Sequence, residues 1–174
     1  QVLYGDIDQQ CTGIVTCIWA TAEVIRRAKE LGANLIVPHE ALFWNHGDRR
    51  EVVAGNKTFE AKCALLDEWG GAVWRCHDYI HSGVPLASDG SMVDGIFYGF
   101  AVKMGWLDSA VSEYIRDAAM LGQGKCAIHM GHFNGEEPGM EYMAKWLPAA
   151  LGDAGAGLPV TFVPMGDTYQ YVLA

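Results

Sequence analysis

The sequence predicts a three-layer α/β/α domain with a mixed, mostly parallel sheet. Two observations lead to this prediction. Apolar segments of strand length alternate with segments of helical period, and the strand segments are apolar almost without interruption. The chain has 174 residues, of which 51% are hydrophobic and 19% charged, so it can bury a core without disulfides or structural metals. We therefore expect a single domain over residues 1–174.

Each element follows from its own pattern along the chain. Short apolar runs are typical of strands that are covered on both faces. The expected strands, in order, are residues 13–19, 34–37, 72–76, 125–130, 160–163 and 169–172. Between them, apolar residues recur at helical spacing after residues that favour helix N-caps. The expected helices start from caps at Thr21, at Asn56 or Thr58 and at Ser91, and two more cover residues 110–121 and 139–151.

Two parts of the chain are less regular. The last two expected strands flank a turn at residues 166–167, which predicts a hairpin and an antiparallel edge to the sheet. At residues 105–109 two helical patterns meet with hardly any connection between them. Either a short turn or an internal segment absent from this chain would account for that junction. The chain also starts at Gln1 rather than Met, which leaves room for a missing N-terminal stretch.

Composition excludes several classes of function. Net charge is −9, and the 12 lysines and arginines are scattered, which argues against a nucleic acid as partner. No apolar run approaches the length of a membrane span, so no membrane association is expected. The five cysteines form no C-x-x-C pair, and Cys17, Cys76 and Cys126 lie in predicted strands. Reduced, unpaired cysteines of this kind indicate a cytoplasmic protein.

Histidines gather at the ends of the predicted strands. In open α/β sheets ligands bind beyond the carboxyl ends of the strands, so side chains placed there are candidates for a site. Three groups of metal-binding residue types occupy such positions: His39 with Glu40, His77 with His81, and His132 with Glu136. The last two residues are four apart, so in a helical turn they share one face and can converge on one ion.

Imidazole combined with carboxylate is a donor set suited to zinc, manganese, iron or cobalt rather than to calcium or magnesium. A single histidine, however, is more often a core or surface residue than a ligand. We take this simpler explanation for His46 and His129, which have no supporting neighbours in the pattern. From spacing alone, a metal site and a plain α/β domain without metal both remain open.

At these three groups the chain resembles a known family, the Nif-three-like dinuclear metal-centre proteins, often described as GTP cyclohydrolase type 2 homologues. The matching stretches are residues 33–43, 73–81 and 126–136, and order and spacing agree over about residues 13–164. The resemblance implies five metal ligands: His39, Glu40, His81, His132 and Glu136. Members of the family are usually longer and have a central segment between the two halves that carry the ligands. This chain lacks that segment, and the junction at residues 105–109 marks where it would lie.

The chain departs from the family pattern at two of these five positions. The family usually has a second consecutive histidine where this chain has Glu40, and an aspartate where this chain has His81. The two exchanges leave three imidazoles and two carboxylates, so the formal charge of the site is kept. The resemblance therefore implies a rewired site for two divalent transition-metal ions, zinc first and iron or manganese as alternatives.

A site of this kind implies metal-assisted hydrolysis of an unknown small-molecule substrate, with Glu136 as the bridging carboxylate. His77 and Glu137 are candidates to support the ligands or to carry protons, although for Glu137 we prefer an interaction with a helix dipole. The alternative function is a non-catalytic metal-binding or regulatory oligomer. Because members of the family form closed rings, the resemblance also implies a homo-oligomer, either a dimer or a hexamer.

Overall fold

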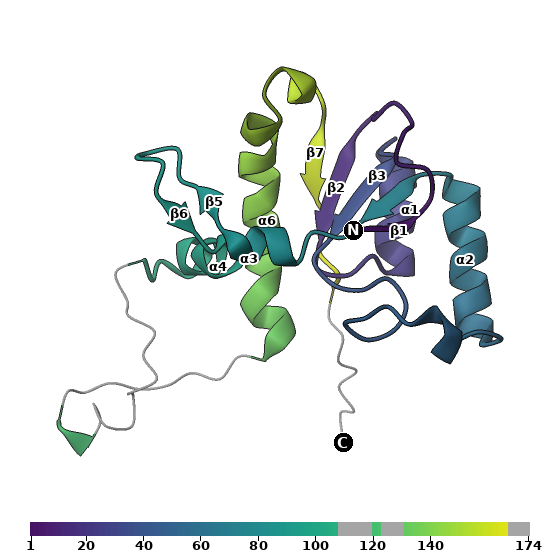
Figure 1. Ribbon diagram of the computed structural model, residues 1–174, viewed down its shortest axis with the longest axis horizontal. Coiled ribbons are helices and arrows are strands. Elements are labelled where there is room, and N and C mark those ends of the chain that lie inside the picture. Colours follow the sequence, from purple (N-terminus) through teal and green to yellow (C-terminus); the bar gives the residue numbers. More distant parts are fainter. Residues whose placement is uncertain (108–119, 123–130, 167–174) are drawn as a thin grey trace.

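The computed structural model describes residues 1–107, 120–122 and 131–166, and its centre is a five-stranded sheet in the order β1-β4-β3-β2-β7 (Figure 1). The strands are β1 (Val2–Tyr4), β2 (Ile14–Cys17), β3 (Leu35–Pro38), β4 (Ala72–Trp74) and β7 (Val160–Phe162). Strands β2, β3, β4 and β7 run parallel, and β1 pairs antiparallel with β4. The predicted mixed, mostly parallel sheet is confirmed.

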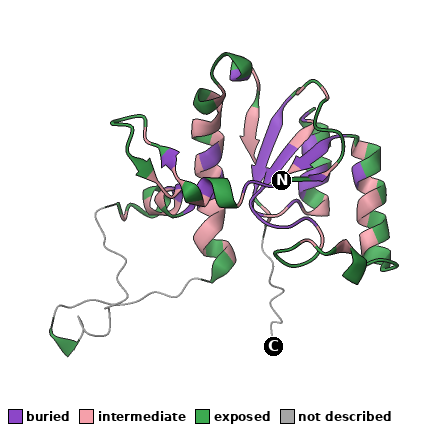
Figure 2. Cartoon of the chain, viewed as in Figure 1, coloured by how far each residue is buried: buried purple, intermediate pink, exposed green. Residues whose placement is uncertain are grey.

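Helices cover both faces of this sheet. Helices α1 (Ala22–Glu30) and α2 (Lys57–Trp69) bury Val24, Ile25 and Leu66 against Val15 and Ile36, which lie on one face. Figure 2 shows the buried residues concentrated in the strands and on the helix faces that meet them.

On the opposite face, α6 (His132–Leu151) and α4 (Gly95–Met104) bury Met140, Met143 and Ile96 against Ile14 and Val37. Because neighbouring residues of a strand point to opposite faces, Ile14 and Val15 contribute to different cores. The predicted three-layer α/β/α architecture is therefore confirmed.

Capping residues set where the helices begin. Thr21 and Asn56 cap α1 and α2 with their side-chain oxygens, as the pattern predicts. The cap of α4 is Asp94 and not Ser91, because the Asp94 carboxylate accepts hydrogen bonds from two backbone N–H groups at the helix start. Ser91 instead bonds to Asp89 in the preceding turn.

Helix α6 begins at His132, seven residues before the predicted start at Gly139, and Pro138 lies inside it. Proline usually interrupts a helix, yet α6 continues through Pro138. Helices α4 and α6 approach each other closely at Gly99 and Gly139. A Cβ on Gly99 would lie 2.8 Å from the Gly139 Cα. The earlier start places His132 and Glu136 on one helix, as the metal-site hypothesis requires.

Small elements link the main layers. Helix α3 (Asp78–Ser82) follows β4, and strands β5 (Val84–Pro85) and β6 (Met92–Val93) form a separate two-stranded sheet that the pattern did not predict. The 3-10 helices are η1 (Arg50–Val52) and η2 (Gly152–Gly155). The predicted strands 125–130 and 169–172 lie outside the described residues, as does nearly all of the predicted helix 110–121, and so do Cys126 and His129.

Two further observations bear on the predictions from composition. Within the described ranges, no helix combines the length and apolar character that crossing a bilayer requires. The four cysteines in those ranges are free thiols, and Cys17 and Cys76 are buried. Burial raises the pKa of the Cys76 thiol to about 11 and also raises that of Cys17, so both behave as small hydrophobic side chains.

Candidate metal centre

The candidate ligands lie directly beyond the carboxyl ends of β3 and β4. Backbone pairing continues past the strands, since the N–H of His39 donates to the Cys17 carbonyl at 3.0 Å and that of Glu40 to the Ile18 carbonyl at 2.9 Å. In the same way, the N–H of Cys76 donates to the Pro38 carbonyl at 3.0 Å. The backbone that carries the first ligands therefore continues the hydrogen bonding of the sheet.

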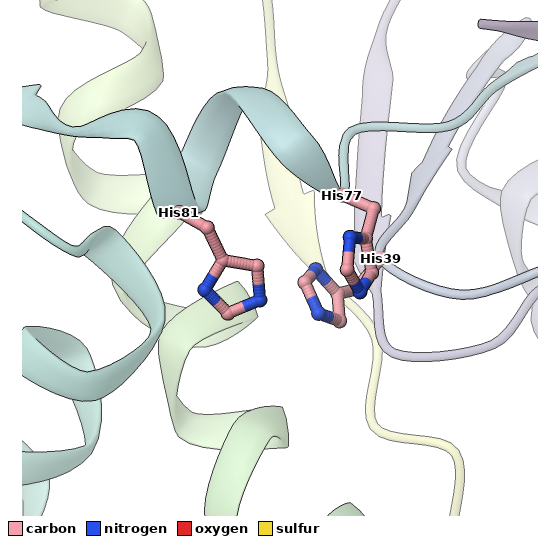
Figure 3. A group of neighbouring side chains, drawn as sticks. All are labelled: His39, His77 and His81. Atoms are coloured by element: carbon pink, nitrogen blue, oxygen red, sulfur yellow. The ribbon is translucent and has the colours of Figure 1, made fainter.

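His39 is the buried centre of a cluster of three imidazoles. Its side chain is fully buried, and its ring lies 4.4 Å from that of His77 and 5.0 Å from that of His81, centroid to centroid (Figure 3). Burial, together with repulsion from the other two rings, lowers the pKa of His39 to about 3, and a backbone interaction with Cys76 opposes only part of this shift. His39 is therefore a neutral imidazole at neutral pH, the form that binds metals.

Neither ring nitrogen of His39 makes a hydrogen bond of full geometry to any described residue, although both are buried. Buried polar atoms nearly always have partners, and each exception requires an explanation such as an ion. A bound metal would supply the missing partner.

The other two histidines of the cluster are oriented by carboxylates. Nδ1 of His81 lies 2.8 Å from Oδ2 of Asp94, and Nδ1 of His77 lies 2.9 Å from Oδ1 of Asp78. An ionised carboxylate only accepts, so each Nδ1 carries the hydrogen and each Nε2 keeps its lone pair. The hydrogen bond from His77 also holds the pKa of Asp78 below its usual range. This arrangement of carboxylate and histidine is typical of metal ligands.

Two carboxylates and a fourth imidazole complete the cluster. Nε2 of His132 lies 2.7 Å from Oε2 of Glu136, one turn further along α6, and 3.0 Å from Oε1 of Glu40. The same Glu136 oxygen is 3.3 Å from Nε2 of His39. Burial is the main cause that raises the pKa of Glu136. A cation bound between these groups would compensate for that burial.

The structure thus brings all five ligands implied by the resemblance into one cluster, and it adds two more histidines. Among the described residues, three groups have potential ligand atoms that all lie within 4.8 Å of one another: His39, His77 and His81; Glu40, His46 and His77; and His39, Glu40 and Glu136. The groups share members, so the donors form one continuous set. Imidazole predominates in it, as transition metals prefer.

The sequence pattern missed a buried arginine behind this cluster. The Arg75 guanidinium donates to the carbonyl oxygens of His39 at 3.1 Å and His46 at 2.6 Å, and its Nη2 lies 3.3 Å from Oε2 of Glu40. The only signal for it in the sequence was a charged residue within an otherwise apolar predicted strand, residues 72–76.

Arg75 also selects the tautomer of the His46 ring. Nη2 of Arg75 lies 2.9 Å from Nδ1 of His46, and a guanidinium can only donate. Nδ1 of His46 therefore accepts, and in the neutral ring Nε2 carries the hydrogen. His46, which the pattern left without a role, is consequently better prepared to donate a hydrogen bond than to bind a metal.

Glu137 has no part in this cluster. Its Oε1 accepts a hydrogen bond from the backbone N–H of Met165 at 2.8 Å, and burial raises its pKa. The first turn of α6 holds no acidic residue, so the predicted interaction of Glu137 with the helix dipole is wrong. Its observed contact ties α6 to the segment that follows β7.

A pocket of about 310 Å³ opens beside the candidate ligands. It is lined by the proposed ligands Glu40 and His132, by His46, and by aromatic and other residues of the neighbouring loops: Trp19, Ala41, Leu42, Phe43, Trp44 and Asn45. A concave, largely apolar pocket with a few polar groups is typical of small-molecule sites.

An α/β fold with histidines and glutamates gathered at the carboxyl edge of its sheet defines a class of candidate transition-metal-binding proteins. Within that class, residues 1–63 match the family described as Duf34/NIF3 (NGG1p interacting factor 3). The match includes His39 and Glu40, and it confirms the resemblance to the Nif-three-like family. None of the curated proteins matches this chain.

Solved structures share the fold of this chain. Protein ybgI, of unknown function, is 15% identical with a TM-score of 0.55, and the match covers 96% of this chain and 90% of that one. Staphylococcus aureus protein SA1388 is 13% identical with a TM-score of 0.52, covering 98% and 91%. At these identities the likeness shows the shared fold.

A Bacillus cereus protein related to NIF3 is 18% identical with a TM-score of 0.47; the match covers 60% of this chain and 26% of the Bacillus chain. This chain therefore spans only about a quarter of that relative's length.

Proposed function

We propose that this protein binds two divalent transition-metal ions and uses them to hydrolyse a small-molecule substrate. The proposed ligands are His39, Glu40, His81, His132 and Glu136, to which the geometry adds His77. The observation that carries the proposal is His39, a buried and neutral imidazole whose two nitrogens make no hydrogen bond of full geometry to the described residues. A buried histidine with only a structural role would be expected to make hydrogen bonds through its ring nitrogens.

The donor set fits the proposed metals. Four imidazoles with two carboxylates suit zinc, iron or manganese, whereas calcium and magnesium require mainly oxygen ligands. A protein-bound zinc ion usually takes four ligands, so six donor side chains exceed what one ion needs. We therefore propose two ions, with zinc as the first choice.

Ions held in this cluster would lower the pKa of water and polarise the bond under attack. The protein's own residues have distinct tasks around them. Trp19, Phe43 and Trp44 wall the adjacent pocket and can hold a substrate against the ligand cluster. His46, held by Arg75 on the edge of the same pocket, can donate a hydrogen bond from Nε2 to the substrate.

The alternative is a non-catalytic metal-binding or regulatory oligomer. A structural metal site is coordinatively closed, while a catalytic one remains open to substrate. The pocket that reaches Glu40 and His132 favours the catalytic proposal. From the family resemblance we further propose a homo-oligomer, either a dimer or a hexamer. The free thiols favour a reducing compartment, and we propose the cytoplasm.

Elemental analysis of the purified chain tests the metal proposal. We expect two equivalents of transition metal in the wild type and loss of at least one equivalent in His132→Ala. Unchanged occupancy in that variant would contradict the ligand assignment. A hydrolase screen of the metal-loaded chain with phosphoesters, nucleotides and cyclic amides tests catalysis. A chain that holds its metals but turns over no compound of the panel would favour the regulatory alternative.

A further inference from the structure

A second pocket of about 310 Å³ shares residues 42–44 with the pocket at the metal centre. Its walls are mainly apolar and consist of Leu42, Phe43, Trp44, Val53 and Phe59. Three polar residues complete the lining: Asn56, Thr58 and Lys62. None of these residues is a proposed metal ligand. The proposed hydrolase therefore leaves this pocket without a role.

Lys62 places a positive charge at this pocket. Its ammonium donates to the Leu42 carbonyl at 2.5 Å and lies 5.4 Å from the centre of the Phe43 ring. It forms no ion pair with any described carboxylate, whereas Lys29 and Lys103 each pair with a glutamate on the surface. An ammonium has three donors, so two remain for a ligand.

Burial disfavours the charged form of Lys62. Burial lowers the pKa of Lys62 from 10.5 to about 8, although Asp48 partly opposes this shift. The amine is still mainly protonated at neutral pH. In the Asp48 carboxylate, Oδ1 accepts from the backbone N–H of Phe43 at 2.6 Å, and Oδ2 lies 3.7 Å from Nε of Arg50. A partly buried cation without a paired anion, in a chain of net charge −9, is a site for an anionic ligand.

We propose that this pocket binds a small aromatic or branched aliphatic monocarboxylate, with the carboxylate on Lys62 and the apolar body against Phe43, Trp44 and Phe59. One ammonium matches one negative charge. A phosphate dianion would leave a charge uncompensated in an already acidic protein. The volume lies at the lower end of the range for ligand pockets, which limits the body to about one ring.

Thr58 provides a second polar contact. Its hydroxyl makes no hydrogen bond to the described residues and lines the same pocket, so it can donate to the other carboxylate oxygen. This binding site goes beyond the proposed hydrolase, and it exists whether or not the metal centre is loaded.

Titration calorimetry with phenylacetate tests the proposal on the full chain, both metal-loaded and after chelation. We expect saturable binding in both states, and at least about tenfold weaker binding of the neutral analogue phenylacetamide. Lys62→Met keeps the aliphatic stem but removes the charge, and should weaken phenylacetate binding about 10- to 100-fold. Lys62→Arg should restore the affinity to within a few-fold. The control Lys57→Met, an exposed lysine at the start of the same helix, should bind as the wild type does.

Three results would overturn the proposal: no saturable binding to the wild type, equal affinity in Lys62→Met, or binding lost on chelation, which would place the carboxylate on the metals. If a thermal melt shows that Lys62→Met does not fold, two measurements still show whether binding depends on the positive charge of residue 62. They are the affinity of the wild type for phenylacetamide and the affinity of Lys62→Arg for phenylacetate. Metal content is measured separately. A chain that binds phenylacetate but no metal would refute only the proposed hydrolase.

Discussion

Arg75 and Glu40 form a buried ion pair in which Nη2 lies 3.3 Å from Oε2 and neither side chain is more than 7% exposed. The partners come from the loops after β4 and β3, 35 residues apart in the chain. Because Arg75 also holds the carbonyl oxygens of His39 and His46, it fixes the loop that carries the first two proposed ligands. The pair therefore connects the stability of the fold to the geometry of the site.

Arg75→Met should destabilise the metal-free protein by about 3–5 kcal/mol, because it leaves the Glu40 carboxylate buried without its guanidinium partner. Urea unfolding in the presence of a chelator measures this loss in the free energy of unfolding. The matched control is Arg27→Met, which removes an exposed pair with Glu30 and should change stability by about 0.5 kcal/mol or less. Saturating metal should recover part of the loss in the Arg75 variant. A loss below about 1 kcal/mol would show that the buried pair does not stabilise the fold.

Asp94 performs two tasks with different oxygens. Oδ1 caps α4 by accepting from the N–H groups of Ile96 at 2.9 Å and Phe97 at 3.1 Å, while Oδ2 accepts from Nδ1 of His81. Asp94→Asn keeps an oxygen for the cap, since asparagine and aspartate cap helices about equally well. The new amide group donates, however, and would turn the His81 ring to the tautomer that cannot bind metal through Nε2.

We therefore expect Asp94→Asn to lower metal affinity about 10- to 100-fold while the unfolding free energy of the metal-free chain changes by less than about 0.5 kcal/mol. Competition with a chromogenic chelator measures the affinity. Asp94→Ala serves as control, because it should lose the same affinity and also about 1 kcal/mol of stability. Wild-type metal affinity in both variants would remove His81 from the ligand set.

His46 and His39 should respond differently to substitution, although both belong to groups that could hold a metal. Since Nδ1 of His46 accepts from Arg75, its Nε2 carries a hydrogen and is not free to bind. His46→Ala should therefore keep the full metal content, whereas His39→Ala should lose at least one equivalent by mass spectrometry. Loss of an equivalent from His46→Ala would show that the ring turns and binds metal through a different nitrogen.

Local patterns predicted the parts of this site that neighbours in sequence determine. The apolar run of β3 placed His39 and Glu40 at a strand end. The four-residue spacing placed His132 beside Glu136, at 2.7 Å. Caps at Thr21 and Asn56 were predictable because each is satisfied within its own helical turn.

Contacts between distant segments were not predictable from such patterns. Strand β1 has three residues, and its sheet partner among the described strands, β4, lies some 70 residues further on, so nothing local marked it as a strand. Similarly, Asp94 could not be identified as the partner of His81, because β5 and β6 first have to bring it there. The donors were visible in the sequence, but the groups that orient them were not.

The affinity of the Lys62 pocket for phenylacetate should fall about tenfold between pH 7 and pH 9. Its ammonium, whose pKa is about 8, is present below that pH and lost above it, so a carboxylate loses its partner as pH rises. The other titratable groups near Lys62 are Asp48, Cys17 and Cys63. Burial raises the pKa of both thiols, so neither gains a charge ahead of the Lys62 transition.

Calorimetric titrations at several pH values measure this dependence, and Lys62→Arg is the matched control because arginine stays charged throughout. The affinity of that variant should be constant over the same range. An equal fall in the arginine variant would assign the pH dependence to another group. A wild-type affinity that stays constant up to pH 9 would show that the Lys62 ammonium does not hold the carboxylate.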